Sequence, residues 1–229
     1  MMLSGTLRNR AAGALALALL LGVLVAGCDT AAETTETSSG SEVDFSADLQ
    51  AGVDAYNEGD FSDAETALAD VVATEPENTE ARKSLALALS AQGKNEEAIE
   101  QYLAVLGTEP DDHVALYRLA LLERLTGLPD DAVGHLEQAV ALNPDDSYVD
   151  ELARTYMQLG DYQKAADTWA PLIAEEDRAP ESAVELLKLQ AEALRLAGDI
   201  DGARGALEQA LAIAPDNSDI KVRLEVLGE

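Results

Sequence analysis

The chain has 229 residues, with 44 acidic against 15 basic residues and a formal net charge of −29 at pH 7. Nucleic acid and anionic lipid headgroups are therefore poor partners, because binding them requires a surface rich in lysine and arginine. Aromatic residues make up only 4% of the chain, which excludes a β-sandwich and indicates an all-helical protein. The single cysteine, Cys28, allows no intrachain disulfide and no cysteine-based zinc site.

The first 27 residues have the pattern of a secretory signal peptide. Arg8 and Arg10 form a cationic start, and residues 11–26 are an uncharged run of Ala, Leu, Val and Gly. This run is short for a membrane-spanning helix, which needs about 20 residues. The ending Leu24-Val25-Ala26-Gly27-Cys28 resembles a bacterial lipobox. The resemblance implies that signal peptidase II cuts before Cys28, which then carries diacylglyceryl and palmitate groups as the first residue.

Lipidation at Cys28 predicts a location in the bacterial cell envelope, with the chain lipid-anchored and facing the periplasm or the cell exterior. Two or three acyl chains anchor a protein stably, whereas one does not. The alternative is an uncleaved anchor helix with an incidental cysteine. Residues 28–44 comprise the lipidated Cys28 and an acidic stretch rich in Thr, Ser and Glu. Because this stretch has almost no large apolar residues, we expect a disordered tether.

Five similar segments follow in residues 45–229, each marked by a glycine and by an alanine five residues later. The glycines lie 34, 34, 33 and 38 residues apart. A period near 34 predicts a stack of helix pairs rather than one globular fold. With the glycine placed at position 15, the repeats begin near residues 45, 79, 113, 146 and 184. The marker glycines are Gly59, Gly93, Gly127, Gly160 and Gly198.

Other repeat positions suit such a helix pair. Position 8 is always small and position 20 is always alanine, which allows the two helices of a pair to approach closely. Positions 24 and 27 are apolar and fill the space towards the next pair. Position 32 is proline in four repeats and ends the second helix, because proline lacks the N–H group. Acidic residues after the proline, such as Asp111-Asp112 and Asp145-Asp146, are expected to cap the next helix.

These positions, in register five times over residues 45 to about 217, resemble the tetratricopeptide repeat. The resemblance implies an all-α, right-handed solenoid of about five helix pairs. Residues 217–229 are expected to form a C-terminal capping helix with Ile220, Leu224 and Leu227 on one face.

The fourth repeat departs from the pattern. Its position 32 is Asp177, and Pro171 lies inside its second helix. We expect a kink near Pro171 and a looser junction between the fourth and fifth pairs, because proline removes a backbone donor. A tolerated irregularity and a hinge both remain open.

Few side chains could carry out chemistry. His113 follows two aspartates at a predicted helix start, and His135 lies one turn after Asp131 without the further ligands that a metal site needs. The chain lacks a Gly-Lys-Ser/Thr phosphate loop and a Gly-x-Ser-x-Gly nucleophile elbow. The sequence therefore predicts a protein that is not an enzyme and that uses no cofactor or metal.

The family resemblance implies a concave inner face, lined by positions 2, 5, 9 and 12 of the first helices. Five of the 13 basic residues that follow residue 27 fall among these 20 positions, together with apolar side chains. Arginine pairs with carboxylates and apolar side chains suit a peptide, which favours a partner of acidic character. The predicted groove residues are Lys83, Leu87, Tyr117, Leu121, Arg124, Arg154, Met157, Lys188 and Arg195.

The alternative for the groove is that its basic residues only offset neighbouring carboxylates such as Glu80, Asp150, Glu185 and Glu192. Arg118 fits one position of the carboxylate clamp found in chaperone-binding repeats. The paired asparagines of that clamp are missing, so the resemblance does not extend to that activity.

The sequence as a whole predicts a membrane-anchored protein–protein interaction scaffold or adaptor of the bacterial cell envelope. It is expected to bind a peptide or protein partner on the concave surface of the repeats and to reach the lipid bilayer through acylated Cys28. The alternative is a self-associating structural protein of the envelope.

Overall fold

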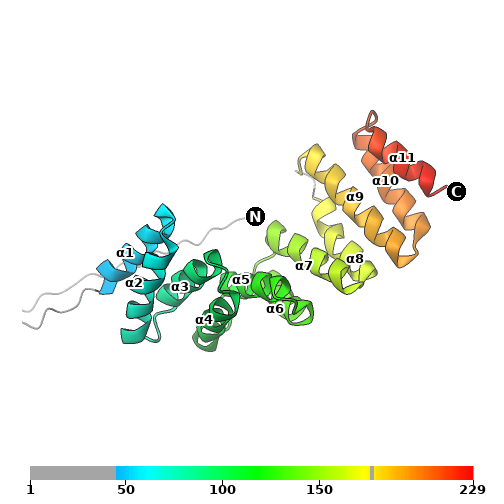
Figure 1. Cartoon of the computed structure of the whole chain (residues 1–229). Helices are drawn as coiled ribbons and strands as arrows, with labels where there is room; N and C mark the ends of the chain where they lie inside the picture. The colour runs from blue at the N-terminus through cyan, green and yellow to red at the C-terminus, as the bar shows by residue number, and fades with distance from the viewer. Residues whose placement is uncertain (1–44, 176–177, 229) are drawn as a thin grey trace, which may run out of the picture. The chain divides into compact units, whose positions relative to one another are not determined.

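The computed structural model describes residues 45–175 and 178–228, where every element is an α-helix (Figure 1). The predicted signal peptide, Cys28, the tether and Asp177 lie outside the described residues. The predicted all-helical stack of five pairs and a final helix is confirmed. The helices are α1 (Phe45–Glu58), α2 (Phe61–Thr74), α3 (Thr79–Ala91), α4 (Asn95–Thr108), α5 (His113–Leu125), α6 (Pro129–Leu142), α7 (Asp146–Leu159), α8 (Tyr162–Ile173), α9 (Pro180–Ala197), α10 (Ile200–Ile213) and α11 (Ser218–Val226).

Successive helices account for nearly all contacts between helices. Each odd-numbered helix from α1 to α9 pairs with the next helix, and each pair packs on the following one (Figure 1). The last helix, α11, packs on α10. Stability in such a stack is a sum of contributions from each pair and from its nearest neighbours.

The tight turns within the pairs depend on their glycines. Gly59, Gly93, Gly127, Gly160 and Gly198 have φ between 77° and 90°. This left-handed conformation ends the first helix, and a side chain with a Cβ would be strained in it.

The close approach of paired helices depends on small residues, as the sequence predicted. The alanines at position 20 are fully buried, and the large residues at position 24 are at most 2% exposed. At Gly52, a Cβ atom would lie 2.6 Å from Cγ of Leu68, so even alanine would be crowded there. The buried alanines are Ala64, Ala98, Ala132, Ala165 and Ala203, and the large residues are Leu68, Tyr102, Leu136, Trp169 and Leu207.

Prolines end four of the second helices, each of which stops two residues before its proline. The residue before each proline leaves the helical conformation, with ψ between 74° and 105°. The proline ring disfavours helical geometry in the residue that precedes it. The first helix after each proline begins with a side chain that accepts a hydrogen bond from a backbone N–H group. These capping residues are Asn78, Asp112, Asp145 and Asn217.

The junction between the fourth and fifth pairs differs from the others. Helix α8 contains Pro171 and continues to Ile173. Helix α9 begins at Pro180, four residues before Val184, where the repeat spacing placed the start, and is 18 residues long. Most of the extra residues of this repeat therefore extend α9.

Arg178 joins three parts of this junction, and its side chain is only 11% exposed. Its Nε donates to the Leu172 carbonyl at 2.5 Å, at the end of α8. Its Nη2 lies 2.7 Å from carboxylate oxygens of both Asp146, on α7, and Glu175. The kink and the hinge near Pro171 stay predictions, while Arg178 provides a link that the sequence did not reveal.

Candidate protein-interaction groove

The predicted groove residues lie on the first helices α3, α5, α7 and α9, and three of their cations form ion pairs with carboxylates on the next first helix or at its start. Three ion pairs join one first helix to the next, across α3–α5, α5–α7 and α9–α11. We call the surface formed by the predicted groove residues on these helices the groove. The pairs are Lys83 with Asp112 at 3.1 Å, Arg124 with Glu151, and Lys188 with Asp219 at 3.1 Å.

Four of the five basic groove residues also pair with carboxylates one turn away on their own helices. Counted over positions 2, 5, 9 and 12 of the five repeats, five basic residues stand beside four acidic ones. This arrangement agrees with the alternative interpretation, in which the basic residues of the groove offset neighbouring carboxylates. The pairs are Lys83 with Glu80 at 3.4 Å, Arg154 with Asp150 at 2.7 Å, Lys188 with Glu185 at 3.1 Å and Arg195 with Glu192 at 2.6 Å.

These contacts favour the charged forms of Glu192 and Lys83. The hydrogen bond from Arg195 lowers the pKa of the Glu192 carboxyl, although burial opposes the shift. Burial also works against the charge of Lys83, yet its hydrogen bond to Asp112 leaves the pKa of Lys83 raised. No cation among the predicted groove residues is left without a carboxylate within the described part of the chain.

The apolar groove residues Leu87, Tyr117, Leu121 and Met157 are half-buried. The ring of Tyr117 on α5 stacks on Tyr148 of α7, with 4.3 Å between ring centroids. This stacking fixes the Tyr117 ring between two first helices and leaves the exposed part of Tyr117 facing outward.

His113 belongs to the same aromatic cluster. Its Nδ1 lies 3.0 Å from the hydroxyl oxygen of Tyr148, and burial raises the pKa of that hydroxyl. The sequence attributed His113 to the charged environment of a helix start. The structure adds the contact with Tyr148, which lies 35 residues further along the chain.

A small hollow of about 60 Å³ opens between α3 and α5. Leu87, Ser90 and Leu121 line it together with Arg118, which is exposed and forms no hydrogen bond or ion pair with any described residue. Tyr102 also lines the hollow, and burial raises its pKa to about 12. Tyr102 is therefore a neutral hydrogen-bonding group over the physiological pH range.

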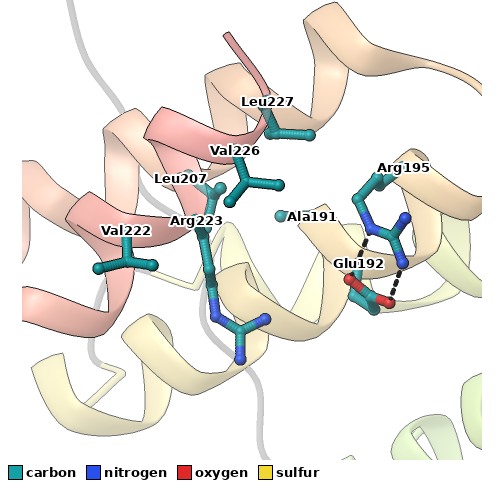
Figure 2. Close-up of a pocket in the computed structure, with 8 residues that line it drawn as sticks. All are labelled: Ala191, Glu192, Arg195, Leu207, Val222, Arg223, Val226 and Leu227. Atoms are coloured by element: carbon teal, nitrogen blue, oxygen red, sulfur yellow. Dashed lines mark hydrogen bonds and ion pairs between the residues drawn. The ribbon is translucent and has the colours of Figure 1, made fainter. Parts of the chain in front are cut away.

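A larger pocket of about 200 Å³ lies between α9, α10 and α11 (Figure 2). On α11, Val222 is 57% exposed and Val226 is 63% exposed. Neither residue was predicted from the sequence, because α11 was expected to serve only as a cap. With Ser218 as position 1, however, they occupy positions 5 and 9 of a first helix, which are groove positions. The pocket is lined by Ala191, Glu192, Arg195, Leu207, Val222, Arg223, Val226 and Leu227.

A pair formed by a buried carboxylate and a histidine lies outside the groove, between α5 and α6. Glu123 is 5% exposed, and its carboxylate lies 2.8 Å from Nδ1 of His135. The hydrogen bond to Glu123 raises the pKa of His135, and the nearby Asp131 carboxylate adds to the shift. From the sequence, only Asp131 was considered as a partner of His135, because Glu123 belongs to the preceding helix.

Residues 45–175 and 178–228 contain no group of three or more His, Cys, Asp or Glu side chains placed to hold a metal ion. None of the helices found there is both long enough and apolar enough to cross a membrane.

The sequence family described as tetratricopeptide repeat matches residues 49–113, 84–147 and 151–218. A crystal structure of MamA protein is 20% identical with a TM-score of 0.67, over 76% of this chain and 94% of that chain. A tetratricopeptide repeat protein from Parabacteroides merdae is 19% identical with a TM-score of 0.65, over 80% and 72%. The structure of Naa15/Naa10 bound to HypK-THB is 19% identical with a TM-score of 0.57, over 72% and 24%. These likenesses show the fold alone, and no curated protein sequence matches significantly.

Proposed function

The chain belongs to the tetratricopeptide repeat family, and we propose that it is a membrane-anchored protein–protein interaction scaffold of the bacterial cell envelope. The observation that carries the proposal is the set of predicted groove side chains on α3, α5, α7 and α9, whose cations link α3 to the start of α5, α5 to α7 and α9 to α11. Repeat stacks use such extended surfaces for binding, and most of their stability comes from the packing of neighbouring pairs. The related fold of Naa15/Naa10 is found in complex with the protein HypK-THB.

The chemistry of the groove favours a partner that makes apolar contacts. The groove cations already have carboxylate partners, so an acidic peptide would have to compete with Asp112, Glu151 and Asp219 for them. Half-buried Leu87, Leu121 and Met157 offer apolar area without such competition. We therefore propose that contacts with apolar side chains provide most of the binding free energy. Acidic side chains of the partner would contribute only at individual positions of the groove.

The same features support a scaffold rather than an enzyme. Repeats of this family typically bind proteins, and the side chains of the groove are engaged in ion pairs and packing. We propose that the protein acts without a cofactor, by holding its partner near the membrane.

The anchoring part of the proposal depends on Cys28 and the apolar run before it. Mass spectrometry of the amino-terminal peptide from the native host is expected to show an acylated Cys28 at the mature amino terminus. Cys28→Ser is expected to move the protein from the membrane fraction to the soluble fraction. Release of the intact chain with unmodified Cys28 would contradict this part.

The binding part is tested by placing a photo-crosslinking amino acid at single positions in the native host. Groove positions Leu87, Leu121 and Met157 are expected to capture the same partner protein. The controls Leu103 and Glu208 are exposed on the second helices α4 and α10, and they are expected not to capture it. Equal capture from the groove positions and the control positions would overturn the proposal that the partner binds in the groove. Capture of the chain itself, with an oligomer in light scattering, would instead support a self-associating envelope protein.

A further inference from the structure

We propose that the pocket between α9, α10 and α11 receives one aliphatic side chain of the partner protein, with a carboxylate of that partner on the pocket's arginines (Figure 2). This inference rests on the proposed function, because the pocket continues the groove onto the last helix. It adds the chemical class of the partner's contact residue, which neither the fold nor the family gives.

The size and lining of the pocket favour a single side chain. Its volume of about 200 Å³ is smaller than the range of about 300–1,000 Å³ that is usual for small-molecule sites. Figure 2 shows Val226 of α11 and Ala191 of α9 facing each other across the pocket. Leu207 and Leu227 complete the apolar lining. Such a lining binds an aliphatic group by removing apolar surface from water.

Val222 and Val226 supply the unburied apolar surface on this side of the pocket. Neither side chain is needed to hold α11 in place, because Ile220 is fully buried against α9 and α10 on the other face. A guest side chain would cover both valines without displacing any part of the chain.

The pocket is formed in advance of binding. Arg204 of α10 donates from Nη2 to the Leu227 carbonyl at 3.1 Å and holds the end of α11. Lys188 of α9 pairs with Asp219 of α11 at 3.1 Å. A partner would therefore lose little affinity to ordering of the site.

Two arginines at the pocket have N–H groups that are not used in hydrogen bonds with the described residues. Arg195 binds Glu192 through Nε and Nη2, and Arg223 binds Asp219 through Nε alone. Each guanidinium has five N–H groups. Nη1 of Arg195 and both Nη atoms of Arg223 have no hydrogen-bond partner among residues 45–175 and 178–228.

The residues that line the pocket carry a net positive charge, and Asp219, which pairs with Arg223, lies beside them. Two arginines and one glutamate line the pocket, in a chain with a net charge of −29. Arginine forms strong charge-assisted hydrogen bonds with carboxylates, often through two nitrogens. The pocket therefore complements a ligand that combines an aliphatic group with a carboxylate.

The test uses N-acetyl-L-leucine, which carries both groups, and the full chain in detergent with 13C-labelled Val and Leu methyl groups. Saturable shifts at millimolar concentrations are expected for Leu207, Val222, Val226 and Leu227. N-acetyl-L-leucinamide lacks the carboxylate, and N-acetyl-L-alanine lacks the larger aliphatic group. Each of these two compounds is expected to bind at least about tenfold more weakly than N-acetyl-L-leucine.

Variants separate the two contacts. Val226→Asp is expected to abolish the shifts of Leu207 and Leu227, whereas Leu103→Asp, a similarly exposed apolar site on α4, is expected to leave them unchanged. Arg223→Gln is expected to weaken binding of N-acetyl-L-leucine to the level of the amide, and to leave binding of the amide as it is.

Absence of pocket shifts, equal binding of acid and amide, or shifts spread over all exposed Val and Leu methyl groups would each overturn the inference. These outcomes are distinct from failure of the proposed function. If groove positions still crosslink to a partner while N-acetyl-L-leucine causes no shifts at the pocket, the scaffold proposal stands and this inference is wrong.

Discussion

Single residues decide the local stability of the stack, and Glu123 with His135 is the clearest case. The Glu123 carboxylate is almost fully buried, and His135 is its hydrogen-bonding partner. A buried charge without a partner is costly, so this pair makes the third repeat sensitive to the protonation of one imidazole.

The raised pKa of His135 sets the direction of this pH effect. The stabilisation is complete below the unfolded pKa of about 6.5 and is lost as pH rises through the higher folded value. Urea unfolding is expected to give a free energy about 1 kcal/mol larger at about pH 5.5 than at about pH 8.5. Both His135→Gln and Glu123→Gln are expected to remove this difference. Its persistence in both variants would assign it to other groups.

The small residue at position 8 leads to a second prediction at this scale. Gly52→Ala gains helix propensity of about 1 kcal/mol, but its Cβ would lie 2.6 Å from Cγ of the fully buried Leu68. Overpacking of about 1–3 kcal/mol is expected to dominate, so the variant is destabilised. Gly134→Ala, in α6 with nothing within 4 Å of its Cβ, is expected to be stabilised. Thermal unfolding compares the two, and a stabilised Gly52→Ala would show that Leu68 can move.

At the scale of helices, the prolines have different effects at different positions. Four of them lie beyond the ends of second helices, where they help to set the boundary. Pro129 lies at the start of α6, where a missing N–H group has no consequence. Pro171 lies inside α8, where it removes a donor that an ordinary residue would provide. Hydrogen exchange over residues 170–184 tests the hinge, which uniform protection would exclude.

Replacement of Pro171 and of Pro129, one of the two prolines that begin a helix, separates these effects. Pro171→Ala is expected to stabilise the protein by about 1 kcal/mol or more, since an interior proline costs about 3 kcal/mol. Pro171 is exposed, so little packing is lost with its ring. Pro129→Ala is expected to bring no such gain. Urea midpoints provide the measurement, and a larger gain at Pro129 would contradict this account of α8.

At the scale of the whole molecule, the described part of the chain is a row of pairs in which each contacts its neighbours. The final helix α11 closes one end, and fully buried Ile220 packs with Val184, Leu187 and Leu207. Because interactions extend only to the next pair, damage at this end should stay near it.

Ile220→Ala tests this confinement. The loss of a fully buried aliphatic side chain is expected to cost about 2–5 kcal/mol. Hydrogen exchange should accelerate in α9, α10 and α11 and remain unchanged in α1–α4. Val222→Ala, on the exposed face of the same helix, is the matched control and should alter stability little. Acceleration throughout the chain after Ile220→Ala would instead indicate one cooperative unit.

Sequence alone was sufficient for the features that recur in at least four of the five repeats. The turn glycines, the alanines at position 20 and the prolines at position 32 reflect requirements of the backbone and of close helix contact. Such requirements are the same in each pair, so they leave a period in the sequence. Ion pairs one turn apart, such as Arg195 with Glu192, were also accessible, because residues three or four apart share a helix face.

The tertiary structure alone decided which side chains remain available for a partner. The Arg124–Glu151 pair, the Glu123–His135 pair and the contact of Arg178 with Asp146 each join different helices. The pocket beside Val222 and Val226 likewise exists because α9, α10 and α11 meet there. Helical periodicity fixes the face on which a side chain lies, but not the distance to a side chain on another helix. That distance depends on how the pairs pack, and it determines which charges are neutralised and which apolar surface stays exposed.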